Sequence, residues 1–174
     1  NSDNDASDDH GHGTHVAGII AGERDGGVAS SHGIAFDAQI YGFKAFNSSG
    51  EAPAGATGSA YGLVEAIGAI DIINNSWGSN ADCASSSACR TTIGTTLYDN
   101  WEDVSQLSTP KISVFAAGND GEDEPSAQCQ TMKYNDDINA VSVCVVAIST
   151  DTTGGNSQGK GLLATFSDKC GSVA

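Results

Sequence analysis

The chain has 174 residues, 39% of them hydrophobic, which is typical of one folded globular domain and not of a disordered chain. It carries 22 acidic and 7 basic side chains, so its formal net charge of -15 would repel a nucleic-acid backbone or an anionic membrane surface. We therefore expect no nucleic-acid partner. Because no run of about 18 apolar residues occurs, we also expect no membrane insertion. The carboxylates are interpreted as a solvated acidic surface.

The polar opening of the chain gives way abruptly to apolar sequence. Residues 1–9 are acidic and predict a loop, and no basic and then apolar signal segment occurs there, so we expect processing or truncation ahead of Asn1. Residues 13–21 (GTHVAGIIA) are small or apolar on nearly all faces, which predicts a buried helix that Gly22 ends. Residues 38–46 (AQIYGFKAF) are rich in aromatics and predict a strand.

The rest of the chain alternates predicted helices with predicted strands. Short apolar runs predict strands at residues 112–117 and 140–148, and residues 71–77 (DIINNSW) begin as a buried strand and turn polar at its end. Apolar side chains at helical spacing predict helices between them: Leu63, Val64 and Ile67 in the first, and Ile93, Leu97, Trp101, Val104 and Leu107 in the second, which Pro110 closes. This order predicts a single α/β domain over residues 1–174, a three-layer sandwich with a largely parallel sheet and helices on both faces.

The cysteines do not suggest a metal site. They form neither a CxxC pair nor a Cys/His spacing typical of structural zinc. We interpret them as disulfide cysteines of an oxidising compartment, with a bond between Cys83 and Cys89, which enclose a short Ser/Ala-rich loop. The odd count leaves one cysteine free or paired outside this chain. The five are Cys83, Cys89, Cys129, Cys144 and Cys170.

The densest chemical signal is the stretch DDHGHGTHVAG at residues 8–18. Three histidines beside two aspartates suggest a divalent metal site, but the HxHxxH spacing is not that of a helical zinc pair and no Glu lies between the histidines. A phosphate loop is disfavoured because the glycines do not match GxGxxG. A simpler alternative is that His10, His12 and His15 only cap and solvate the start of the helix.

The segment HGTHVAG resembles the histidine motif of subtilisin-like serine proteases, whose first histidine is the general base. The resemblance assigns that role to His12, and an imidazole that titrates near neutrality suits it. Residues 33–40 (GIAFDAQI) and 162–171 (LLATFSDKCG) also resemble this family. The fold that the resemblance implies is the same α/β sandwich, incomplete at both ends of this chain.

Two further motifs lie at the predicted carboxyl ends of strands, where parallel sheets build their sites. NNSWGS resembles the family's substrate-binding segment, in which the backbone of Ser76, Trp77 and Gly78 would pair with an extended peptide. AAGNDG resembles the oxyanion segment. The resemblance implies that Asn119 donates its amide to the oxyanion and that the primary specificity pocket is lined by Ala116, Ala117 and Gly118. Taken alone, the tryptophan would indicate core packing and the asparagine a turn.

Two parts of the family pattern are missing from the chain. The catalytic aspartate should follow an apolar strand well upstream of His12, and none of Asp3, Asp5, Asp8 and Asp9 has that context, so none is assigned. The nucleophile motif Gly-Thr-Ser does not occur. Residues 155–159 (GNSQG) match G-x-S-x-G formally, but their surroundings are polar and Gly-rich and no histidine follows, so we reject them as a nucleophile elbow.

The resemblance implies a secreted or cell-surface serine endopeptidase of bacterial type that cleaves extended polypeptides without a catalytic cofactor. The chain itself should be inactive because it lacks the nucleophile. Acidic loops such as residues 120–124 are candidate sites for a structural calcium ion of the kind this family often uses, although none has EF-hand spacing. The alternative is a degenerate, non-catalytic module of the same fold that binds peptide or serves as a scaffold.

Overall fold

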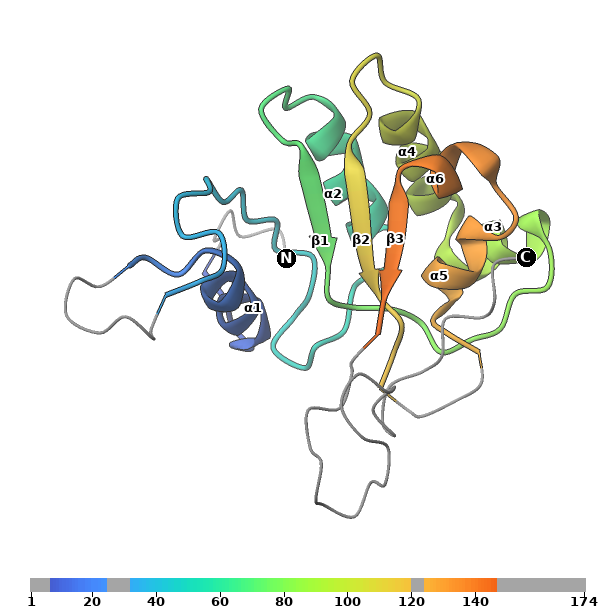
Figure 1. The fold of residues 1–174 in the computed structure, drawn as a ribbon. Helices are drawn as coiled ribbons and strands as arrows, with labels where there is room; N and C mark the ends of the chain where they lie inside the picture. The colour runs from blue at the N-terminus through green and yellow to red at the C-terminus, as the bar shows by residue number, and fades with distance from the viewer. Residues whose placement is uncertain (1–6, 25–31, 120–123, 147–174) are drawn as a thin grey trace, which may run out of the picture. The chain divides into compact units, whose positions relative to one another are not determined.

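The computed structural model describes residues 7–24, 32–119 and 124–146 (Figure 1). The chain divides into two compact units, Asn1–Ala60 and Tyr61–Ala174. In the described ranges, no helix is long and apolar enough to cross a membrane. The G-x-S-x-G match at residues 155–159, the family-like segment 162–171 and Cys170 lie outside the described residues.

The first unit contains helix α1 (His12–Ala21), which Gly22 ends as predicted. The backbone N–H groups of residues 33–35 donate to carbonyl oxygens of the last turn of α1 and of Gly22. A Cβ atom on Gly33 would lie 2.4 Å from the Gly22 nitrogen, so a residue without a side chain is required at this close approach.

Two predictions for the first unit are wrong. No residue of α1 is buried, and Ile19 is 56% exposed; within the first unit, residues 33–35 bond only to the C-terminal end of the helix. Residues 38–46 form no strand, and the structure pairs no described strand with them. Aromatic and β-branched residues favour a strand only where a neighbouring strand and a packing surface exist, and Ile40 remains 49% exposed.

The second unit contains a three-stranded parallel sheet in the order β1-β2-β3. The strands are β1 (Ile72–Asn75), β2 (Ile112–Ala116) and β3 (Ser142–Val145). Each lies inside a predicted apolar run, and the parallel pairing confirms the predicted α/β class. The register aligns Asn75 with Phe115, so the ends of β1 and β2 leave the sheet side by side.

The core of this unit lies against one face of the sheet. Helix α4 (Thr95–Ser105) contributes Leu97, Trp101 and Val104, and the Trp101 and Phe115 rings lie 4.5 Å apart. The predicted second helix is in fact two helices, because Gly94 adopts a φ of 92° that separates α4 from α3 (Ser86–Ile93).

Helix α2 (Ala56–Glu65) spans the boundary between the two units, and its second half belongs to the second unit. Val64 is buried as predicted, but Leu63 is 60% exposed, so the predicted shared face is wrong for Leu63. Leu63 and Val64 are consecutive, and consecutive helical residues point about 100° apart. The Tyr61 hydroxyl donates to the Ser113 hydroxyl on β2 and accepts from the Asn75 side chain on β1.

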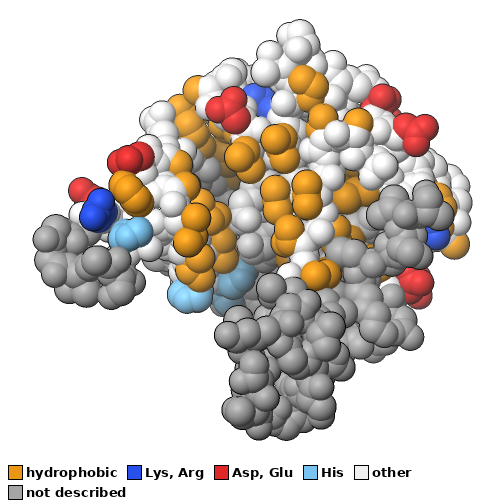
Figure 2. Space-filling view, viewed as in Figure 1, with side chains coloured by type: hydrophobic (Ala, Val, Ile, Leu, Met, Phe, Trp, Pro, Cys, Tyr) orange, Lys and Arg blue, Asp and Glu red, His pale blue; other side chains and the backbone are white. Residues whose placement is uncertain are grey.

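The opposite face of the sheet is apolar and exposed. Figure 2 shows hydrophobic side chains gathered over the three strands. The exposed hydrophobic residues on this surface are Ile72, Ile112, Val143 and Val145. Within the described part of the second unit, helices cover one face of the sheet.

Two short helices that the sequence did not predict complete the described part of the second unit. They are α5 (Ala127–Met132), whose residues are all buried, and α6 (Asp136–Ala140). A disulfide between Cys129 and Cys144 joins α5 to β3. The predicted disulfide between Cys83 and Cys89 is also present.

Candidate functional site

His12 is the first residue of α1 and is exposed. The chain reaches it through Gly11, whose φ of 89° is accessible mainly to glycine. The His12 and His10 rings lie 6.3 Å apart in an edge-on arrangement. The predicted helix boundary at the histidine motif is thus confirmed, and it leaves the His12 imidazole accessible to a reacting group.

Asp8 holds the turn that carries His12. One carboxylate oxygen accepts from the backbone N–H groups of His10 and Gly11, and the other accepts from the N–H and hydroxyl of Thr14. These bonds, chiefly those from Thr14, favour the charged carboxylate and hold the pKa of Asp8 well below its usual range.

Asp8 is therefore a helix-capping residue, and its oxygens bond to the start of the helix. This role agrees with leaving Asp8 unassigned as the catalytic aspartate. The cap was not predicted from the sequence, although an acidic residue a few positions ahead of a predicted helix is a recognised signal for one.

The described residues around the histidine motif do not form a metal site. Asp9 pairs with Lys44 at 2.7 Å. Among the described residues, no group of three or more His, Cys, Asp or Glu side chains lies close enough to hold a metal ion. Residues 120–123 of the candidate calcium loop lie outside the described residues.

The end of β1 carries the first predicted peptide-binding segment. Ser76 and Trp77 are half-buried and Gly78 is exposed. The Ser76 hydroxyl accepts from the Asn74 side chain at 3.0 Å. The Trp77 ring packs edge-on against Phe115, with their centroids 5.5 Å apart, so the side chain serves packing.

The end of β2 carries the second predicted segment. Ala117 is buried, and its N–H donates to the Val145 carbonyl at the end of β3. Gly118 follows with a φ of 131°, a value that favours glycine. Asn119 is exposed, and no hydrogen bond from its side chain to another described residue is present.

Residues 126–128 connect these two segments, and no motif in the sequence indicates such a role for them. Ser126 donates its hydroxyl to the Ala116 carbonyl and its N–H to the Ala117 carbonyl. The Ala127 N–H donates to the Ser79 carbonyl, and the Gln128 side chain accepts from the Ser79 N–H at 2.9 Å. These contacts join positions 9 to 49 residues apart, from Ser126–Ala117 to Ser79–Gln128, so no local sequence pattern predicts them.

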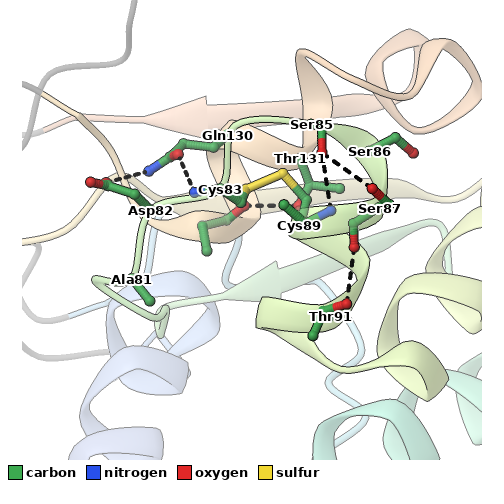
Figure 3. Close-up of a disulfide and its surroundings, with 12 residues drawn as sticks. Ala81, Asp82, Cys83, Ser85, Ser86, Ser87, Cys89, Thr91, Gln130 and Thr131 are labelled. Carbon is green, nitrogen blue, oxygen red and sulfur yellow. Dashed lines mark hydrogen bonds between the residues drawn. A yellow bond between two sulfur atoms is a disulfide. The ribbon is translucent and has the colours of Figure 1, made fainter.

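Helix α5, which begins at Ala127, also holds the loop after Ser79, through Gln130 (Figure 3). The Gln130 side chain accepts from the Cys83 N–H and donates toward Asp82. The Cys83–Cys89 disulfide then ties the loop to α3, whose first turn is capped by the Ser85 hydroxyl.

Comparison with known proteins identifies the class. The family model described as the subtilase family matches residues 1–173, so the chain belongs to that family. The chain is 30% identical over 151 residues to a subtilisin-like protease of Coccidioides posadasii, an alignment that covers 85% of this chain and 32% of that protein.

Two other relatives are similar over shorter stretches. The minor extracellular protease Epr of Bacillus subtilis is 34% identical over 124 residues, which is 68% of this chain and 16% of Epr. An extracellular serine protease of Serratia marcescens is 48% identical over 68 residues, which is 38% of this chain and 6% of that protein. The chain thus spans about a third or less of the length of these relatives.

Proposed function

We propose that this chain supplies the general base and the oxyanion donor of a secreted serine endopeptidase whose nucleophilic serine lies outside these 174 residues. The observation that carries the proposal is subtilase membership over residues 1–173, together with the three family motifs in the family's order. The extracellular relatives and the two disulfides support secretion.

Each residue has a defined role in the proposed reaction. His12 takes the proton of the serine hydroxyl as its oxygen attacks the scissile carbonyl carbon, and then gives that proton to the leaving amine. Asn119 donates its amide to the oxygen that becomes negative in the tetrahedral intermediate. Water then hydrolyses the acyl-enzyme, again with His12 as base.

The substrate is an extended polypeptide. Its backbone would pair with the backbone of Ser76, Trp77 and Gly78, as an added strand pairs with a sheet edge. The residue before the scissile bond would contact Ala116, Ala117 and Gly118. The exposure of Gly78 and the packing of the Trp77 ring on Phe115 support a role for this segment's backbone.

The test is His12→Ala in the full-length protein. Casein hydrolysis should fall by roughly 10⁶-fold, the magnitude known for the same role in a subtilisin, because the serine loses its base. His15→Ala is the matched control, three positions along the same helix, and should retain most activity. Retained hydrolysis in His12→Ala contradicts the proposal, and equal loss in both variants with reversal by a divalent metal favours the metal alternative.

A second measurement separates the endopeptidase from the degenerate peptide-binding module. A fluorophosphonate should label one serine of the full-length protein and no serine within these 174 residues, because the chain contains no Gly-Thr-Ser. A full-length protein that binds unfolded peptide but is never labelled supports the module. Labelling mapped to Ser157 revives the rejected nucleophile elbow.

A further inference from the structure

The two predicted peptide-binding segments diverge where the sheet ends. The last aligned pair of β1 and β2 is Asn75 with Phe115. Beyond it, Ala117 bonds to Val145 at the end of β3, whereas Ser79 bonds to residues 127 and 128. The β1–β2 ladder therefore no longer sets the spacing of the segments past this point, and another part of the chain has to do so.

The start of α5 occupies the position that sets this spacing. Ser126 is bonded to the carbonyls of Ala116 and Ala117 on one side. On the other side, a Cβ atom on Gly78 would lie 2.8 Å from the Ser126 Cβ and 3.4 Å from the Gln128 oxygen. The two segments thus contact the same three-residue stretch.

This stretch is a firm support. Ser126 and Gln128 are 1% and 3% exposed, and all of α5 is buried. The Cys129–Cys144 disulfide fixes the helix to β3 immediately after Gln128. A buried, cross-linked support transmits the loss of one of its hydrogen bonds to whatever it positions, because little else can move to compensate.

We propose that Gln128, seated beside Ser126, is a positioning residue that holds the peptide-binding segment at residues 76–79 at its working distance from Ala116, Ala117 and Gly118. The inference rests on the proposed function, which assigns peptide binding to these segments. Gln128 acts through the Ser79 N–H and touches no reacting atom. Its loss should therefore weaken peptide binding and leave the chemical step unchanged.

The experiment compares two near-isosteric variants of the full-length protein in a His12→Ala background, where peptide is not turned over. Gln128→Met removes the acceptor for the Ser79 N–H, and Gln128→Glu keeps an acceptor oxygen. The probe is a fluorescein-labelled, unfolded casein peptide, and its Kd is measured by anisotropy. We expect the Kd to rise about tenfold in Gln128→Met, as for one part-buried donor that loses its acceptor, and about twofold or less in Gln128→Glu.

Hydrogen exchange and kinetics provide the internal checks. Amide exchange mapped to residues 77–81 should accelerate in Gln128→Met and not in Gln106→Met, a control that removes the exposed bond from Gln106 to Asp137. With His12 restored, KM should rise in Gln128→Met while kcat stays within about twofold.

The two proposals fail in different ways. Equal Kd values for Gln128→Met and the parent, or equal increases for Met and Glu, overturn the positioning role. A fall in kcat at constant KM overturns it as well. If the parent binds the peptide but the protein with His12 never cleaves it, the endopeptidase proposal is contradicted, and the Met and Glu comparison still decides the role of Gln128.

Discussion

The turn that carries His12 and the segments at the sheet ends are held in place by different kinds of contact. The His12 turn depends on one exposed carboxylate, Asp8, whose bonds span two to six residues of the chain. The sheet-end segments depend on buried groups such as Gln128, whose bond to Ser79 spans 49 residues. Local contacts of the first kind follow a recognisable sequence pattern, whereas the second kind exists only after the chain has folded.

The largest expected effect comes from Asn119. It lies in a sheet-end segment held by long-range bonds, but its replacement should affect catalysis and not folding. Its exposed amide makes no side-chain bond with a described residue, so replacement should not change the melting temperature. Asn119→Ala in the full-length enzyme should lower kcat by about 10² to 10³ with KM nearly unchanged, the magnitude known for this role in a subtilisin.

Asn119→Asp sharpens the same test. A turn-forming asparagine tolerates aspartate, but an oxyanion donor does not, since a carboxylate would face the developing negative charge. Steady-state kinetics on both variants, with thermal melts to check folding, give the answer. A folded Asn119→Asp enzyme with near-normal kcat would contradict the oxyanion assignment.

The same division explains which predictions succeeded. The strands at residues 112–117 and 140–148 were predictable because each is a largely apolar run, and the strand at residues 71–77 because it begins with two buried-type isoleucines before turning polar. The start of α1 was predictable because Gly-rich polar sequence changes to apolar sequence there. The strand predicted at residues 38–46 failed because strand formation needs a partner that local sequence cannot supply.

Residues 126–128 illustrate the limit for the site. Their role comes from bonds to Ser79, Ala116 and Ala117, and nothing in the sequence PSAQ indicates those partners. Cys129 and Cys144 were expected to be disulfide cysteines, but their pairing was not predicted, because it depends on where α5 lies against β3.

The two disulfides allow local and longer-range contacts to be compared by their effect on the free energy of unfolding. Cys83–Cys89 closes a loop of 6 residues and Cys129–Cys144 one of 15. Loop-closure entropy then predicts that Ala at both cysteines lowers the free energy of unfolding by about 2 kcal/mol for the shorter loop and about 3 kcal/mol for the longer one. Urea unfolding of the two double variants measures this difference. If removing the Cys83–Cys89 disulfide lowered the free energy of unfolding more than removing Cys129–Cys144 does, local cross-links would contribute more to stability than long-range ones, against this comparison.

The smallest expected effect concerns Asp8, whose bonds to Thr14, Gly11 and His10 lower its pKa. A carboxyl group whose pKa is lowered on folding stabilises the fold above its ordinary pKa of about 3.9 and loses that contribution as pH falls through the lower folded value. Order at the start of α1 should therefore decline below about pH 4 in the wild type, and should be weaker and independent of pH in Asp8→Asn. NMR of the Thr14 amide follows this change directly.

At neutral pH, Asp8→Asn should reduce kcat/KM by about twofold to fivefold, since the turn that carries His12 loses part of its support. Asp9→Asn is the matched control, because the Asp9 carboxylate pairs with Lys44 and makes none of the cap's hydrogen bonds. It should leave the Thr14 amide and its pH dependence unchanged. If Asp9→Asn moved the Thr14 amide as much as Asp8→Asn does, the start of α1 would depend on charge in general, and the His12 turn would not be held by one local cap.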